Sequence, residues 1–269
     1  MDYSFVAASL IACSGFLPQN NLSLPVTDKN EGLTKEEYNL VIDKVSRVYR
    51  SVIADYGGRL KINRKWESSV VNAGTLRNGN IWEINMYGGM ARHREMTKDG
   101  FALVLCHEIG HHIGGAPKKI IGGKSFWSST EGQSDYWASL KCMRRVFGKD
   151  DNEEVISELT VPQEVEAECK TALCKRIALA SLAVSKINAD IRDIPHPEFG
   201  TPDLTRVMIT DDKHPVAQCR LDTLFHGALC PLSWKKNVSQ GYEGPGTCHP
   251  MEGYKKGIRP KCWYSSTRK

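Results

Sequence analysis

The chain lacks the features that mark a zinc ribbon, a thioredoxin-type redox enzyme or a nucleic-acid-binding protein. None of its nine cysteines forms a Cys-x-x-Cys pair, which argues against a second, structural zinc site and against dithiol redox chemistry. The net charge of +5 is spread along 269 residues without a basic block, so the composition gives no case for nucleic acid as a partner. A chain of this length can bury a full core, as one domain or as two small ones.

The amino terminus lacks the positive charge with which a signal peptide begins, although an apolar run is present. Residues 5–13 are too short to span a bilayer and end in Leu-Ile-Ala-Cys, which looks like a bacterial lipobox with Cys13 as the lipidated residue. Three interpretations of this run stay open: the signal of a lipoprotein, the signal of another exported form, and an apolar amino-terminal strand. The eight other cysteines form an even set, which favours disulfides in an exported protein. We therefore expect a periplasmic, outer-membrane lipoprotein or secreted location, with membrane contact only through a lipid on Cys13.

One motif organises the rest of the chain: residues 107–111 read H-E-x-x-H. In a helix, residues four apart share a face, so His107 and His111 can present two imidazoles to one ion. Glu108 lies next to that face, where it can act as general base on a metal-activated water. The apolar run at 100–106 favours a buried helix that exposes this face to a site.

A catalytic zinc usually has three protein ligands and one open position, so the motif needs a third ligand. One family of zinc proteases uses a histidine six residues after the second, but here Pro117 stands at that place. The other common choice is a glutamate on a following helix, and Glu131 lies 131 − 111 = 20 residues after His111. Asp135, one helical turn later, can accept the second N–H of a ligand histidine and fix its tautomer. The pattern predicts one catalytic Zn²⁺ ion.

The combination of H-E-x-x-H and E-x-x-x-D resembles the gluzincin group of zinc metalloproteases, with a spacing like that of thermolysin. The Asn-Ala pair at 72–73, the strand expected at 81–87 and the motif helix further resemble the CAAX-prenyl-endopeptidase-type bacterial metalloproteases. The likeness covers about residues 71–224 and implies a zincin-like fold. It also implies that His214 approaches the zinc or stabilises the oxyanion, with Arg220 supporting that loop. A surface-loop histidine is the alternative for His214.

Hydrophobic patterning predicts an α+β fold with a small mixed or antiparallel sheet on the motif helix, then a mainly helical part and a disulfide-rich tail. Helices are expected at 35–56, 100–113, 129–147 and 162–191, strands at 59–66, 70–76 and 81–87, and a loop at 116–130. Three regions are expected: a signal or lipobox and tether at 1–30, the zincin-like metalloprotease domain at 31–195, and a cysteine-rich segment packed on the same domain at 196–269. Three side chains are weaker candidates for the role of His214: His226, Tyr136 and Tyr87.

The function that these residues predict is a zinc-dependent endopeptidase. Its partner would be a polypeptide substrate, bound as an added strand on the edge at 81–87. An alternative is a zinc-stabilised binding or chaperone-like exported protein with little or no proteolysis, in which His214 holds the open zinc position. Hydrolysis of a non-peptide amide would use the same residues. Glu108 favours an enzyme, since a purely structural zinc site does not need it.

Overall fold

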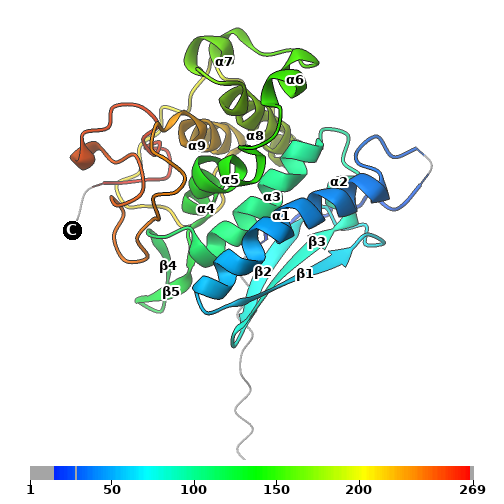
Figure 1. The fold of residues 1–269 in the computed structure, drawn as a ribbon, viewed down its shortest axis with the longest axis horizontal. Helices are drawn as coiled ribbons and strands as arrows, with labels where there is room; N and C mark the ends of the chain where they lie inside the picture. The colour runs from blue at the N-terminus through cyan, green and yellow to red at the C-terminus, as the bar shows by residue number, and fades with distance from the viewer. Residues whose placement is uncertain (1–14, 28, 267–269) are drawn as a thin grey trace, which may run out of the picture.

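The structure is a computed structural model that describes residues 15–27 and 29–266 (Figure 1). The lipobox expected at Cys13 lies outside the described residues. Within them, no helix has both the length and the apolar character needed to cross a membrane. The protein mixes helices with two small sheets, which agrees with the predicted α+β class.

The first helix begins where its sequence predicts. In α1, Lys35–Asp55, the Thr34 hydroxyl accepts a hydrogen bond from the Glu37 backbone, and the Glu37 carboxylate accepts one from the Thr34 backbone. This reciprocal pair satisfies two backbone donors that a helix start leaves open. Apolar residues at helical spacing, among them Tyr38 and Ile42, bury one face of α1 against the motif helix.

Three strands form a mixed sheet: β1 Arg59–Lys65, β2 Ala73–Asn78 and β3 Ile81–Tyr87. An Asn-Gly turn with Gly79 at a φ of 57° joins β2 and β3 as an antiparallel hairpin. β1 pairs with β3 in parallel, so the strand order is β1-β3-β2. The prediction that 81–87 is a free edge is therefore wrong, because β3 is hydrogen-bonded on both sides and β2 lies at the edge.

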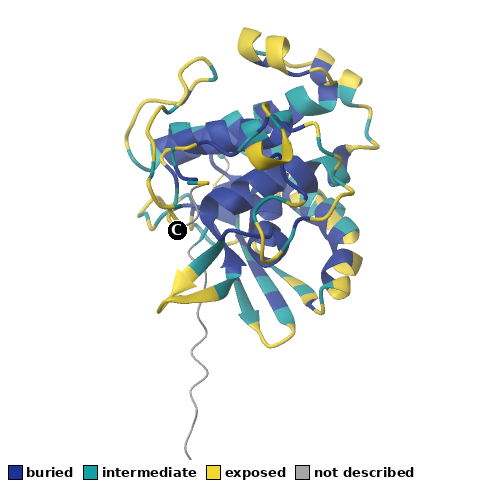
Figure 2. Cartoon of the chain, turned by 90° about the vertical axis from the view of Figure 1, so that its left-hand side faces the viewer, coloured by how far each residue is buried: buried dark blue, intermediate teal, exposed yellow. Residues whose placement is uncertain are grey.

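The motif helix, α3 Lys98–Ile113, lies at the centre of the molecule (Figures 1 and 2). It contacts α1, both strands of the β2–β3 hairpin and the helices that follow it in the chain. Residues 100–113 are all buried, as the apolar run predicted. Because α3 is enclosed on every side, its ionisable residues need partners inside the protein.

The segment after α3 forms a hairpin where a loop was expected. β4 Lys118–Ile121 and β5 Lys124–Ser129 pair in antiparallel register, and Gly122 and Gly123 take φ angles of 57° and 75° at the turn. Only glycine adopts such angles at no steric cost, which suits a two-residue hairpin turn. Short strands rich in lysine and serine give no alternating apolar pattern, and for this reason the hairpin was missed.

The second site helix follows β5 directly. α4 Glu131–Trp137 continues through a π-helical turn, Ala138–Cys142, into α5 Met143–Phe147, so the helix expected at 129–147 is present with one irregular turn. The helix expected at 162–191 is broken into α7 Gln163–Glu168 and α8 Ala172–Asp190. The remaining helices are α2 Gly88–Ala91, α6 Asn152–Ser157, α9 Ala217–Leu229 and a single 3-10 turn at Pro250–Glu252.

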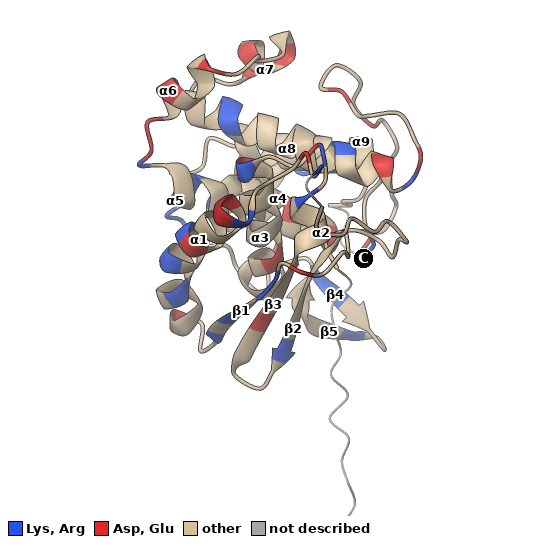
Figure 3. Cartoon of the chain, turned by 90° about the vertical axis from the view of Figure 1, so that its right-hand side faces the viewer, with Lys and Arg blue, Asp and Glu red and all other residues tan. Residues whose placement is uncertain are grey.

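α9 was not expected, since its sequence was assigned to an irregular tail. It packs against α8, α4 and the π-helical turn and so belongs to the core of the helical part. The short α6 and α7 lie at the periphery, and the red stretches of both helices in Figure 3 mark acidic residues. Acidic residues near a helix start interact favourably with the helix dipole, which supports these short helices.

The amino-terminal segment, defined here as residues 15–24, is part of the packed structure. It was expected to be a tether, but Phe16 and Leu17 are buried, at 0% and 1% exposure. The segment runs antiparallel to the chain at 69–73: Phe16 N donates to Ala73 O at 3.0 Å, and Leu24 N donates to Ser69 O at 2.8 Å. The packed structure therefore begins well before residue 31.

All eight cysteines within the described residues are paired. The four disulfides are Cys106–Cys142, Cys169–Cys174, Cys219–Cys262 and Cys230–Cys248. Cys169 and Cys174 pair across the break between α7 and α8, which a continuous helix would have prevented. The first bridge joins α3, one residue before His107, to the π-helical turn that continues the helix of Glu131.

We predict that the Cys106–Cys142 disulfide stabilises the fold more than the Cys169–Cys174 disulfide does. It closes a loop with a sequence separation of 36, so replacing both cysteines with alanine should lower the free energy of unfolding by about 4 kcal/mol. The same change at Cys169 and Cys174, with a separation of 5, should cost about 2 kcal/mol. Urea unfolding of the two double variants and the wild type measures both losses. An equal loss in the two variants would contradict the loop-length argument.

Candidate metal centre

Three side chains from two helices converge inside the protein. His107 and His111 lie one turn apart on α3, and Glu131 is the first residue of α4. An oxygen of Glu131 (Oε2) lies 3.2 Å from His107 Nε2 and 3.5 Å from His111 Nε2. One ligand atom from each of the three residues lies within 4.8 Å of the others, and all three residues are fully buried. This arrangement is a possible metal-binding site.

The chemistry of the donor atoms fits a bound cation. Neither His107 Nε2 nor His111 Nε2 has a hydrogen-bond partner among the described residues, although both are buried. Their other ring nitrogens are engaged: His107 Nδ1 lies 2.7 Å from an Asp135 oxygen, and His111 Nδ1 lies 2.9 Å from the Ser129 carbonyl oxygen. An Nδ1–H that donates to an oxygen leaves the lone pair on Nε2, directed at the cluster. A metal ion would satisfy these otherwise orphaned atoms.

Asp135 and Arg220 hold His107 in this orientation. Asp135 follows Glu131 by one turn of α4, and its second carboxylate oxygen accepts a hydrogen bond from Arg220 Nε at 2.9 Å. Burial opposes the charge on Asp135, but Arg220 and His107 outweigh it and hold the pKa of that carboxyl below its usual value. Arg220 lies on α9 and is itself fully buried, so the pair is a fixed support for the imidazole.

We predict that Asp135→Ala weakens metal binding about 10–100-fold, because the His107 ring loses the partner that fixes its tautomer. A competition titration against a chromophoric chelator measures the dissociation constant. Asp222→Ala, which removes a buried carboxylate on α9 away from the cluster, is the matched control. Equal affinity in the wild type and in Asp135→Ala would show that Asp135 does not support the ligand.

Glu108 lies beside the cluster as an isolated carboxyl group. It is fully buried, and neither of its oxygens has a hydrogen-bond partner among the described residues. Burial raises the pKa of Glu108 to about 8, even though the nearby His107 opposes the shift. A carboxyl group with a pKa near neutrality can both accept and release a proton, which is what general acid–base catalysis requires.

Lys119 is a member of the site that the sequence analysis missed. It lies on β4, and its Nζ contacts the second oxygen of Glu131 (Oε1) at 2.7 Å. Burial disfavours a charged Glu131, but the surrounding histidines, His111 and His214 first, hold its pKa well below the usual value. The assignment of 116–130 to a loop left no reason to direct this lysine inward.

His214 lies at the cluster, as the resemblance implied. Its Nε2 is 3.5 Å from Glu131 Oε2 and donates a hydrogen bond to the backbone carbonyl of Gly15. The weaker candidates are engaged elsewhere: the Tyr136 hydroxyl donates to the Gly257 carbonyl, and the His226 ring pairs with the Ile258 carbonyl. Tyr87, at the end of β3, lies under the ammonium of Lys65.

His112, the residue after His111, has a structural role outside the cluster. Its ring is stacked between Trp82 and Trp127, with ring centroids 5.0 Å away on both sides. Thr75 and Arg77 bond to its two ring nitrogens. Burial, followed by the charge of Arg77, holds its pKa well below the usual value, so His112 stays neutral.

Comparisons with protein-family models, with curated proteins and with solved structures find no match for this chain. Its function must therefore be argued from the cluster itself. Two imidazole nitrogens, one carboxylate oxygen and a buried carboxyl group meet there, beside a histidine that donates to a peptide carbonyl.

Proposed function

We propose that the chain is a zinc-dependent endopeptidase with a zincin-like fold. The observation that carries the proposal is the cluster of His107, His111 and Glu131. The neighbouring carboxyl group of Glu108 has no hydrogen-bond partner in the part of the chain that the structure describes. Two nitrogen ligands and one carboxylate ligand are a common set for catalytic zinc, which keeps one position open. A structural zinc site is closed by four ligands and has no use for an adjacent general base.

Each residue has a distinct role in peptide hydrolysis. A zinc ion in the site supplies Lewis acidity and makes water a stronger nucleophile. Glu108 takes the proton of the attacking water and later gives it to the leaving amine nitrogen. His214 donates a hydrogen bond to the carbonyl oxygen, on which negative charge develops. Asp135 and Arg220 keep the imidazole of His107 in position.

Disulfide content supports an exported enzyme. Four disulfides join all the described cysteines, a pattern typical of oxidising compartments. We place the protein in the periplasm, at the outer membrane through a lipid on Cys13, or outside the cell, with polypeptides as its substrates.

The test is a paired measurement on the purified protein: zinc content by elemental analysis, and hydrolysis of unfolded casein with and without a zinc chelator. We expect one zinc per chain and hydrolysis that stops on chelation and returns on addition of zinc. Zinc without hydrolysis of any peptide would favour a zinc-stabilised binding or chaperone-like protein. A protein that binds no zinc would end the proposal.

A further inference from the structure

The amino-terminal segment crosses the candidate metal centre. The Gly15 carbonyl accepts the hydrogen bond from His214 Nε2, and that nitrogen lies 3.5 Å from Glu131. The next carbonyl, of Phe16, accepts a hydrogen bond from Arg220 Nη1 at 2.8 Å. Two consecutive backbone carbonyls of the segment are thus bound at the cluster: one by His214, which lies beside the candidate ligand Glu131, and the next by Arg220, which also binds Asp135.

Residues at the edge of β2 bind the remaining backbone groups of the same stretch. Phe16 N donates to Ala73 O at 3.0 Å. The side-chain amide of Asn72 bonds twice to Leu17, accepting from its N–H at 2.9 Å and donating to its carbonyl at 3.0 Å. Recognition through backbone groups at a sheet edge is how proteins hold an extended peptide without regard to its sequence.

Two side-chain positions of the segment are selective. The Phe16 ring is fully buried and lies perpendicular to the His107 ring, with 4.9 Å between the two ring centroids. The Arg220 guanidinium lies 4.3 Å from the centroid of the Phe16 ring. A Cβ added to Gly15 would lie 2.6 Å from the Asn72 side-chain oxygen and closer still to the Ala73 carbonyl. The site therefore accommodates glycine before the Phe16 nitrogen and a large apolar residue after it.

We propose that this segment is an intramolecular substrate and that the peptide bond between Gly15 and Phe16 is the bond the enzyme hydrolyses. The inference rests on the proposed function and names a substrate class for it: peptides with glycine before the cleaved bond and a bulky apolar residue after it. The Gly15 carbonyl is the one bonded to His214, and the Phe16 nitrogen, which would leave, is the one bonded to Ala73.

The reaction consumes one water molecule. The water oxygen attacks the carbonyl carbon of Gly15, and the bond from that carbon to the Phe16 nitrogen breaks. Glu108 accepts a proton from the water and passes it to the departing nitrogen. The products are a carboxylate on Gly15 and a new amino terminus on Phe16.

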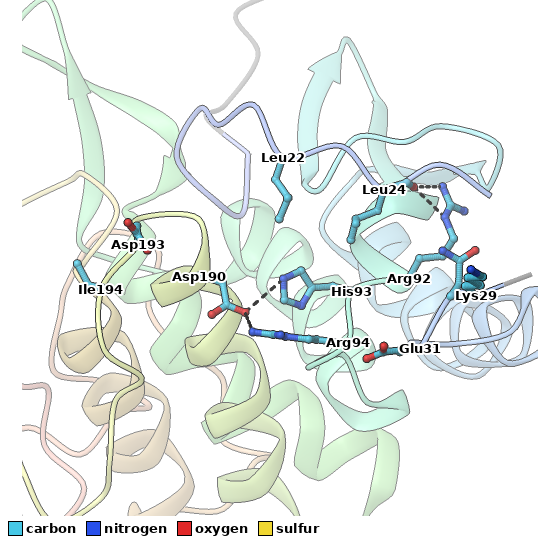
Figure 4. A pocket seen from close by; sticks show the side chains of 11 residues that line it. Leu22, Leu24, Lys29, Glu31, Arg92, His93, Arg94, Asp190, Asp193 and Ile194 are labelled. Carbon is cyan, nitrogen blue, oxygen red and sulfur yellow. Dashed lines mark hydrogen bonds and ion pairs between the residues drawn. The ribbon is translucent and has the colours of Figure 1, made fainter. Parts of the chain in front are cut away.

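Figure 4 shows how the segment is held at its other end. Arg92, which is 2% exposed, donates from Nε and Nη2 to the Leu24 carbonyl at 2.9 Å and 2.8 Å. Leu22 and Leu24 lie along one side of a cavity of about 500 Å³ whose far side carries Asp190, paired with His93. A segment fixed at Leu24 keeps Gly15 at a high effective concentration beside the cluster, so cleavage within one chain is favoured over cleavage of another.

The test follows the Gly15–Phe16 bond in the full chain by intact mass and amino-terminal sequencing. The zinc-loaded wild type should begin at Phe16, and Glu108→Gln should keep the bond intact. An uncut Glu108→Gln chain mixed with wild type should remain uncut, because its segment sits in its own site. Cleavage in that mixture would overturn the intramolecular step.

Two variants test the seating of the segment. Gly15→Val should slow self-cleavage at least about 100-fold while casein hydrolysis persists, because the added side chain displaces the bond from the reacting groups. Gln19→Ala, at an exposed position of the same segment, is the matched control and should cleave like the wild type. Cleavage of Gly15→Val at the wild-type rate would contradict the proposal.

A readout independent of activity uses hydrogen exchange in zinc-free Glu108→Gln protein. The amides of Phe16 and Leu17 should be protected, and Asn72→Ala should lose the protection at Leu17. Unprotected amides would overturn the docking. A wild type that hydrolyses casein but keeps its Gly15–Phe16 bond would overturn this inference alone, whereas zinc-loaded protein that cleaves neither would defeat the proposed function as well.

Discussion

Replacing Glu108 with glutamine should lower kcat for casein hydrolysis about 1,000-fold while the zinc stays bound. The glutamine amide has nearly the shape of the carboxylate but cannot accept a proton from the attacking water. Glu108 is not one of the three ligand residues, and it makes no hydrogen bond within the described residues that the change would remove. The effect should therefore fall on kcat, with little change in metal content.

Three measurements on the same preparations separate a loss of catalysis from a loss of metal or of folding: kcat, zinc per chain and the midpoint of thermal unfolding. Glu153→Gln, at an exposed position on α6, makes the same chemical change far from the cluster and should behave as the wild type. Undiminished hydrolysis by Glu108→Gln would remove the general base from the proposed mechanism. A variant that lost its zinc would instead show that Glu108 contributes to binding the metal.

Local patterns in the sequence predicted the parts of this site that one helix carries. The four-residue spacing placed His107 and His111 on one face, and the i, i+4 spacing placed Asp135 behind Glu131 on α4. The capping box of α1 and the Asn-Gly turn of the hairpin are local in the same way, since each depends on neighbouring residues alone.

Contacts between distant segments could not be read in the same way. β3 lies in the centre of the sheet because it also pairs in parallel with β1. The alternation of apolar and polar residues in a strand does not tell which strands pair with it. Lys119 reaches Glu131 only because a hairpin forms in place of the expected loop. The resemblance alone pointed to Arg220, which lies 85 residues from its partner Asp135.

The amino-terminal segment was misjudged for a different reason. Its proline, asparagine and serine content is typical of a linker, and Phe16-Leu17 is too short an apolar pair to predict burial. Its order comes from groups supplied by the rest of the fold, such as the Asn72 amide and the Arg92 guanidinium. The composition of a segment therefore does not predict whether other parts of the fold bind it.

Glu131→Gln should abolish zinc binding under conditions in which the wild type is saturated. The change removes a ligand charge, so the loss of affinity should exceed the 10–100-fold that an outer partner of a ligand is worth. In the wild type, with free zinc about 1,000-fold above the dissociation constant, binding stabilises the fold by about 4 kcal/mol. A chelator should remove this stabilisation from the wild type and should not affect Glu131→Gln.

Comparing wild type and Glu131→Gln in the presence of chelator measures a second contribution of Glu131 to stability, which does not depend on zinc. Its other oxygen contacts Lys119 at 2.7 Å, and the lysine side chain is only 12% exposed. Breaking one partner of a buried ion pair costs about 3–5 kcal/mol, so zinc-free Glu131→Gln should still unfold at lower urea than the zinc-free wild type. An equal effect of chelator on the wild type and on Glu131→Gln would mean that Glu131 is not a ligand. We expect that chelator does not change the stability of Glu131→Gln, and that this variant is less stable than the zinc-free wild type. Together these results would show that the Glu131 carboxylate both binds the metal and holds the β4–β5 hairpin against α4.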